Sequence, residues 1–493
     1  DRKRMTTLHW SEGRLLAFTK GAPESVLPLC TRQQGSSTPA ELTVDGRKKV
    51  LAQSQAFAQQ AYRVLAVAMR EVERGVDQLE ADTVEQGLTF LGLVAMMDPP
   101  HREVPDAIKK CRRAGVRVMM ITGDHPLTAL AVARKIGLAP ETIPTEPGHF
   151  VPVIEGAHID TFSDDQLRQL LTPTAPGEPD PIFDRMAPRH KMRIVSALKE
   201  MREVVAVTGD GVNDAPALKT ADIGIAMGIA GTDVAKETAS MILLDDNFAT
   251  IVHAIEEGRA VYTNIRKFVT YVLASNVPEI VPYLGFGLSS MPLALTIPQI
   301  LAVDLGTDMV PALALAAEPP EGGVMDDPPR PRTERLLSWD VILRAYAFLG
   351  LIEAGIAMGG FFLYLYSQGW SWAAPLDWTS PLYKEATTVT FAGIVAAQVA
   401  NVFACRSDRI SAFRLGWFSN PLILVGVAVE LTILLVMTYS PVGHLVLGTA
   451  SLPAWIFGPL ALGAIGLLLA DELQKFVRGR MGARLSLQPD RGT

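Results

Sequence analysis

Six apolar stretches of membrane-spanning length occupy the second half of the sequence and limit what the chain can fold into. An α-helix needs about 20 apolar residues to cross the hydrocarbon core of a bilayer. The stretches cover approximately residues 268–288, 293–315, 342–366, 386–404, 420–438 and 453–470. The mean hydropathy of +0.22 agrees with this reading. We therefore expect a multi-pass integral membrane protein that is surrounded by lipid in this part.

The loops between these stretches predict the orientation. Lys and Arg gather in three loops, residues 328–335, 406–414 and 475–484. The intervening loops carry none, and they are residues 289–291, 368–381 and 441–453. Positive loops stay on the cytoplasmic side. We therefore expect the soluble part and the C-terminus in the cytoplasm, with the plasma membrane as the expected location.

Residues 1 to about 245 have the pattern of a soluble region. Leu15–Phe18 and Arg63–Arg70 alternate as strands do, and Val50–Tyr62 has helical spacing. The run Leu88–Met96 is almost continuously apolar, which predicts a strand buried on both faces.

Strands and helices then alternate. The expected helices cover residues 104–114, 127–137, 191–201 and 215–220, and the expected strands cover 116–121, 204–207 and 223–226. A Pro- and Gly-rich interval, Pro140–Pro181, interrupts them. This alternation predicts an α/β domain with a doubly wound parallel sheet. The net charge of −7 makes nucleic acid an unexpected partner, and three widely spaced cysteines fit a reducing cytosol.

Three polar segments of this region suggest a phosphate site. Thr122-Gly123-Asp124 ends a strand, Lys191 opens a helix, and Asp210 and Asp214 follow another strand. Ligands gather at the carboxyl ends of parallel strands. There, a hydroxyl and backbone N–H groups hold phosphoryl oxygens, a lysine neutralises charge, and a carboxylate binds Mg²⁺.

Acidic residues inside two apolar stretches suggest a second site. Ser275, Asn276 and Glu279 share one helical face, as do Asp304, Thr307 and Asp308, because their spacings are three or four. Each acid at mid-membrane costs about 2.5–3.5 kcal/mol on insertion scales. This cost favours a binding site for a hard cation or proton over a polar cluster that only holds helices together.

Weaker candidates lie on later stretches. Gln398 and Asn401 are three residues apart, although uncharged amides often serve helix packing. Glu353 and Glu430 lie within or near other spans and rank lower.

Several motifs resemble those of the P-type ATPases, which are cation pumps with a haloacid-dehalogenase-like phosphorylation domain. Thr208–Pro216 is similar to the hinge signature of that family, and Ile223–Gly228 continues the likeness. Lys20–Glu24, Asp98–Pro100 and Met120–Asp124 are similar to further motifs. The likeness runs from residue 1 to about residue 475. His101 departs from it, because the family usually has Arg there.

The resemblance implies roles for matching residues. Lys20 is expected to line the adenine pocket of an ATP site, and Arg63 to reach the nucleotide phosphates. Asp210 is expected to bind Mg²⁺, with Asn213 and Asp214 completing that site. The other expected nucleotide or phosphoryl contacts are Lys3, Thr122, Gly123, Asp124, Arg185, Lys191 and again Asn213. Without the motifs, Lys3, Lys20 and Arg63 would be read as ordinary solvated charge.

The family's nucleophile, the Asp of an Asp-Lys-Thr-Gly-Thr string, does not occur in the sequence. We therefore expect the C-terminal portion of a type II pump, partnered by an N-terminal half and inactive or weakly active without it. The expected parts are a partial α+β nucleotide-binding domain (1–97), a phosphorylation domain (98–246), a stalk (247–267), a six-helix membrane domain (268–475) and a tail (476–493).

The expected function is coupling of ATP hydrolysis, with Mg²⁺, to cation transport. Ser275–Glu279 and Asp304–Ala312 look most like the sodium/potassium and proton/potassium pumps, so a monovalent cation is favoured and Ca²⁺ is the alternative. Two other classes remain: a phosphatase on a membrane anchor, and a non-catalytic remnant that binds ATP or a partner.

Overall fold

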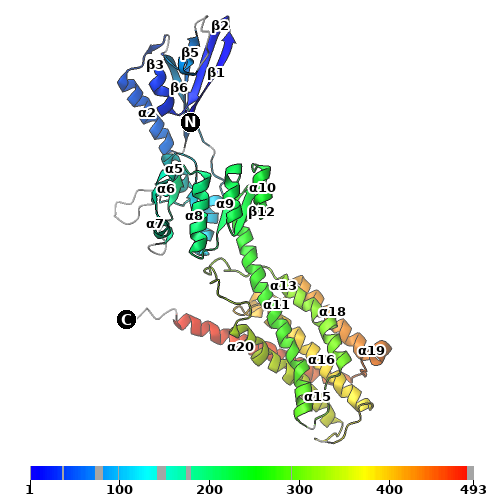
Figure 1. The fold of residues 1–493 in the computed structure, drawn as a ribbon. Helices are drawn as coiled ribbons and strands as arrows, with labels where there is room; N and C mark the ends of the chain where they lie inside the picture. The colour runs from blue at the N-terminus through cyan, green and yellow to red at the C-terminus, as the bar shows by residue number, and fades with distance from the viewer. Residues whose placement is uncertain are drawn as a thin grey trace, which may run out of the picture. The chain divides into compact units, whose positions relative to one another are not determined.

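The chain forms two compact units in the computed structural model (Figure 1). The first holds Asp1–Ala254 and Met325–Pro329, and the second holds Ile255–Val324 and Arg330–Thr493. The structure describes residues 2–35, 38–60, 62–72, 81–97, 99–140, 152–173, 179–289, 291–372 and 374–485. Asp98, much of the interval 140–181 and the end of the tail lie outside the described residues, and the five-part domain division stays a prediction.

A six-stranded sheet opens the first unit. Its order is β1 (Arg4–Ser11), β2 (Arg14–Gly21), β5 (Arg63–Val72), β6 (Leu88–Met96), β3 (Cys30–Gln33) and β4 (Ala40–Glu41). Only the β3–β6 pair is parallel. Helix α2 (Val44–Gln59) lies beside this sheet (Figure 1).

The prediction for β6 was right about the strand and wrong about its surroundings. Leu88 and Phe90 are buried in the core of this sheet, but Val94 and Met96 are more than 40% exposed. The strand joins a largely antiparallel sheet, and only its first half is covered by packed side chains. A continuous apolar run therefore did not mean burial on both faces here.

Two three-stranded parallel sheets follow. The first has the order β7 (Met120–Ile121), β9 (Ile182–Asp184) and β8 (Val153–Glu155). The second has the order β10 (Ala206–Gly209), β11 (Ile223–Met227) and β12 (Met241–Leu243). Helices α4 (Val104–Arg113), α5 (Pro126–Lys135), α8 (Pro188–Glu200) and α9 (Ala215–Thr220) lie between the strands in sequence.

Parallel pairing is thus confirmed, but the described strands form two sheets where the sequence predicted one. The strand predicted over 116–121 is reduced to Met120–Ile121, which pairs with Ile182 and Phe183 of β9.

The second unit is helical. It receives the end of α11 (Phe248–Leu288) and continues with α12 (Ile297–Ala302), η3 (Val303–Thr307), α13 (Met309–Ala316), η4 (Leu343–Gly350), α15 (Leu351–Ser367), α16 (Pro381–Ala404), α18 (Pro421–Tyr439) and α20 (Phe457–Leu485). Both η3 and η4 are π-helical. Figure 1 shows α16 among the other long helices, and it is the most buried of them.

Among the described residues, five helices are long and apolar enough to cross a membrane: Ile297–Ala316, Trp339–Ser367, Pro381–Ala404, Pro421–Tyr439 and Ala454–Arg478. The predicted first span, 268–288, is helical as the last part of α11 but is not among the five. Asn276, Glu279 and two prolines lower its hydropathy. A sixth span therefore stays a prediction.

Candidate phosphate and cation sites

Lys191 and Asp214 form the centre of the candidate phosphate site. Nζ of Lys191, in the first turn of α8, donates to Oδ1 of Asp214 at 2.6 Å. Oδ2 of Asp214 accepts from the backbone N–H groups of Asp210 and Gly211, each at 3.2 Å. Burial raises the pKa of Asp214, but the Lys191 ammonium and these N–H groups outweigh it, so the pKa lies below its ordinary value. Asp214 therefore fixes the loop after β10 as a charged carboxylate.

The same loop leaves one carboxylate free to bind a cation. Asp210 is exposed, and within the described part of the chain no hydrogen bond or ion pair engages its side chain. Asn213 is also exposed. A Cβ added at Gly209 would lie 2.4 Å from Cβ of Asp214, so glycine is required where β10 enters the loop. An exposed carboxylate on a fixed loop suits Mg²⁺, which binds proteins through one or two carboxylates.

The Thr122 segment forms a separate turn at the end of β7. Oγ1 of Thr122 accepts from the backbone N–H of Asp124 at 3.1 Å, and Arg185 N–H donates to the Asp124 carbonyl at 3.2 Å. The Arg185 guanidinium pairs with Glu155 at 3.0 Å. Strands β7, β9 and β8 therefore bring these predicted contacts to one edge.

No hydrogen bond or ion pair among the described residues joins Thr122, Gly123 or Asp124 to Lys191 or Asp210. The Thr122 segment follows a strand of one three-stranded sheet and Asp210 follows a strand of the other, so a single phosphate site stays a prediction.

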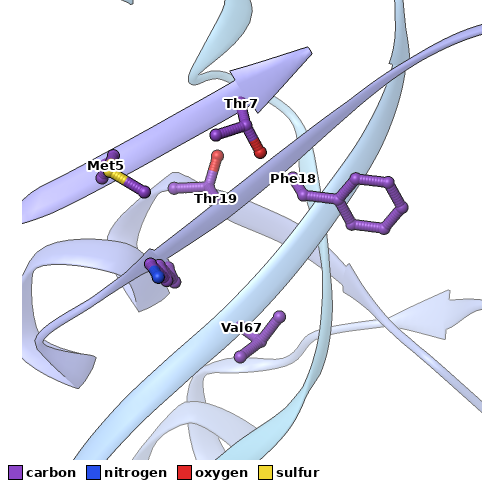
Figure 2. A pocket seen from close by; sticks show the side chains of 6 residues that line it. Met5, Thr7, Phe18, Thr19 and Val67 are labelled. Atoms are coloured by element: carbon purple, nitrogen blue, oxygen red, sulfur yellow. The ribbon is translucent and has the colours of Figure 1, made fainter. Parts of the chain in front are cut away.

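Lys20 lines a small pocket on the six-stranded sheet, and Figure 2 labels the five other residues around it. The pocket has a volume of about 190 Å³ and is lined by Met5, Thr7, Phe18, Thr19, Lys20 and Val67. Lys20 pairs in register with Met5 on one side and Val67 on the other. This volume is below the roughly 300–1,000 Å³ of pockets that enclose drug-sized ligands. The pocket therefore suits one flat ring beside a cation.

Arg63 and Lys3 lie near this pocket in the fold. Arg63 begins β5 and is exposed, four residues before Val67. An even spacing puts both on one face of the strand, about 13 Å apart. The backbone carbonyl of Lys3 accepts from Ala22 N–H at 3.0 Å, which ties Lys3 to the loop after Lys20.

Gln398 of α16 joins three segments of the candidate cation site. Its Nε2 donates to Oγ of Ser275 at 2.7 Å and to Oδ1 of Asp308 at 2.5 Å. Its Oε1 accepts from Oγ1 of Thr307 at 3.0 Å. Ser275, Thr307, Asp308 and Gln398 are all buried. The amide that the sequence ranked as a weaker candidate is the residue that connects the helices.

The predicted acids face the interior. Glu279 is buried and lies beside Asp304, and Asp308 is within electrostatic reach of both. Oε1 of Glu279 is buried without a hydrogen-bond partner. Asp304 and Asn276 are half-buried. Glu279 and Asp308 are therefore buried inside the helical unit, with Asp304 beside Glu279.

Two glycines allow helices to approach this cluster closely. A Cβ at Gly350 would lie 2.4 Å from Val277 and 2.9 Å from the Ala274 carbonyl, so η4 touches α11 there. A Cβ at Gly426 would lie 3.1 Å from Pro311, so α18 touches α13. Both contacts lie within one helical turn of an acid, Glu353 or Glu430.

In the described residues, no three His, Cys, Asp or Glu side chains form a ready metal-binding group. Hydroxyl, amide and backbone oxygens would have to complete a shell around a cation here, as they do for Ca²⁺ in proteins.

Three family models match the chain. They are "P-type ATPase, cytoplasmic domain N" over residues 1–103, "haloacid dehalogenase-like hydrolase" over 192–255 and "Cation transporting ATPase, C-terminus" over 292–477. The sodium/potassium-transporting ATPase subunit alpha of Tetronarce californica is 36% identical over 95% of this chain and 50% of its own length. A calcium-transporting ATPase of Bacillus subtilis is 39% identical over 89% of this chain and 46% of its own length.

The chain belongs to the P-type cation-transporting ATPases. It corresponds to a C-terminal portion of them and spans about half the length of the curated relatives it matches. The matched models contain the Lys20 pocket, the loop after β10 with Asp210 and Asp214, and the Asp304–Asp308 segment, and Lys191 lies one residue before the second of them.

Sequence reasoning missed several residues of this P-type ATPase chain. Phe18, Met5 and Val67 line the pocket, and only the alternation of β1 and β2 around Lys20 signals them. Tyr271 is fully buried beside Asp308, one turn before Ser275, and this spacing could have identified it.

Proposed function

We propose that the full-length protein is an ATP-driven cation pump in which an aspartyl phosphate forms on an upstream segment. One observation carries this proposal: Gln398 ties Ser275 and Asp308 together beside Glu279, inside a helical unit with spans of membrane length. A membrane anchor or a packing contact does not need converging buried acids. The expected partners are ATP, the transported cation, membrane lipid and the upstream half.

In the first unit, we propose that the pocket around Phe18 and Lys20 receives the adenine ring. Arg63, on the same strand face as Val67, would meet the phosphates, and Lys3, Thr122–Asp124 and Arg185 are further proposed contacts. A bound Mg²⁺ would neutralise phosphate charge, and Asp210 is the carboxylate placed to hold it. Lys191, oriented by Asp214, would hold a phosphoryl oxygen, and Asn213 would complete the loop.

Coupling is proposed to run through α11. Its 41 residues begin before the Ala254–Ile255 boundary of the two units and reach past Glu279 without a break. If ligand binding at one site changes the affinity of the other site, binding at the second site changes the affinity of the first by the same free energy. A shift of α11 would alter the positions of Ser275 and Glu279 relative to Gln398.

The proposed ion is a monovalent cation, because Ser275–Glu279 and Asp304–Asp308 carry hydroxyls, amides and three acids in the pattern of sodium/potassium pumps. Ca²⁺ is the second candidate, and the 39% identity to the calcium-transporting ATPase of Bacillus subtilis favours it. We propose the plasma membrane as the location.

The test uses the full-length protein in proteoliposomes, with ATP hydrolysis and acid-stable phosphoenzyme measured against Na⁺, K⁺, H⁺ and Ca²⁺. We expect one cation to stimulate both, and Asp308→Asn to raise the half-stimulating concentration at least 100-fold. Asp377→Asn, a change in the exposed loop before α16, is the matched control. Phosphoenzyme without cation dependence would favour an anchored phosphatase, and ATP binding without phosphoenzyme would favour a remnant.

A further inference from the structure

Glu353 is a buried acid on a helix that carries none of the expected cation ligands. It lies in α15, its side chain is 0% exposed, and neither carboxylate oxygen has a hydrogen-bond partner. No ion pair in the described structure reaches it either. A buried carboxylate without a partner lowers the free energy of unfolding unless a ligand binds it.

Its surroundings consist of further unpartnered polar groups. The side chain of Asn401 is fully buried and lies next to Glu353, and its Nδ2 meets no acceptor in regular hydrogen-bond geometry. Glu430 of α18 is also 0% exposed with two unpartnered oxygens, and it is within electrostatic reach of Glu353 and Asp308. Three helices thus direct unsatisfied groups into one dry region.

Close backbone approaches occur one turn before Glu353 and one turn before Glu430. Glu353 follows directly on the π-helical segment η4, and π segments in helices are frequent at functional sites. Gly350, the last residue of η4 and three residues before Glu353, lets η4 approach Ala274 and Val277 of α11 closely. Gly426, one turn before Glu430, does the same for α18 against Pro311.

We propose that Glu353 is a direct ligand of the transported cation, and that it shares this ion with Glu430 and the side chain of Asn401. This inference rests on the proposed pump function and adds α15 to the binding site. The four carboxylate oxygens make a hard donor set, which suits Na⁺, K⁺ or Ca²⁺ better than a soft transition metal.

The test measures thermal unfolding of the full-length protein in detergent, without ATP, as each of Na⁺, K⁺ and Ca²⁺ is titrated. We expect one cation to stabilise the wild type. Glu353→Gln is expected to raise the half-stabilising concentration at least tenfold while unfolding no earlier than wild type in cation-free buffer. Glu353→Asp, which keeps the charge but shortens the side chain, should give an intermediate shift.

Glu385→Gln is the matched control, because this acid of α16 is satisfied by the Tyr364 hydroxyl at 2.9 Å. It should leave the cation response unchanged. If Asp308→Asn shifts the response and both Glu353 variants do not, the inference about Glu353 is wrong and the pump proposal stands. If no cation stabilises the wild type, the proposed function itself fails.

Discussion

The buried acids of the two units differ in whether their carboxylates have hydrogen-bond or ion-pair partners. Asp214 in the first unit is balanced by the Lys191 ammonium and two backbone N–H groups. Glu353 and Glu430 in the second unit have no partner on either oxygen. The Asp214 carboxylate is already neutralised by its partners. The carboxylates of Glu353 and Glu430 are still able to bind a cation.

The difference separates a positioning role from a binding role. A carboxylate that is already neutralised orients its neighbours and leaves Lys191 fixed for a phosphoryl group. Carboxylates without counter-charge in a dry interior destabilise the fold until a cation arrives. Cation binding is therefore expected to offset the loss of folding stability that the unpaired carboxylates cause in the second unit.

The largest expected effect on stability is that of Lys191→Met. Removing one partner of a buried ion pair typically costs roughly 3–5 kcal/mol, and we expect about 3 kcal/mol, the low end of that range, because Lys191 is partly exposed. The measurement is urea unfolding of the first unit, followed by hydrogen exchange. Lys110→Met, at an exposed lysine of α4, should change little. Equal losses in both variants would contradict the pairing described for Asp214.

Gly350→Ala should cost about 1–3 kcal/mol in the second unit, as overpacking in a close contact does. The new Cβ would meet Val277 and the Ala274 backbone, so the cation response should also weaken. Gly355→Ala is the matched control on α15, since nothing lies within 4 Å of its Cβ position. That control should be neutral or slightly stabilising. If Gly350→Ala changed neither the stability nor the cation response, the close helix contact at Gly350 would not be what positions Glu353.

Glu430→Gln tests the comparison directly, because it should raise the stability of the fold, whereas Lys191→Met should lower it. The amide adds donors to a region that has too many acceptors, so we expect a gain of about 1 kcal/mol in cation-free buffer. Differential scanning calorimetry in detergent measures it. A loss of stability there would mean that Glu430 has a partner in the folded protein.

The smallest effect concerns pH. The pKa of Asp214 is lowered in the fold, so its stabilisation is fully present above the unfolded value of about 3.9 and is lost as pH falls through the folded value. Hydrogen exchange of the Asp210 and Gly211 amides, corrected for the intrinsic rate, should speed up a few-fold as pH falls from 6 to 3. Asp214→Asn should remove that dependence, and an unchanged profile would show that the two amides are protected by something else.

Local patterns in the sequence predicted most elements of the fold but not how they combine. Helices α4, α5, α8 and α9 lie within a few residues of their predicted bounds, since amphipathic spacing and turn residues act locally. Which sheet a strand joins depends on distant partners. Leu88–Met96 was therefore predicted to be buried on both faces although its second half is partly exposed, and the strand at Met120–Ile121 was predicted too long.

The candidate sites show the same limit. Glu279 and Asp308 stood out because charge in an apolar stretch is costly wherever it lies. Gln398 was undervalued because its importance comes from joining Ser275, Thr307 and Asp308, which no single helix reveals. Glu353 ranked low for a similar reason, since its isolation from counter-charge depends on the packing of α11, α15 and α18.

The π-helical turn η3 contains Asp304 and ends directly before Asp308 on one span. A π turn holds an extra residue relative to an α turn, and each residue accounts for about 100° around an α-helix axis. If that surplus residue migrated by one position along the span, one acid would swing around the axis while the turns above and below kept their packing. A shift of the π turn by one residue would therefore be enough to bind or release an ion.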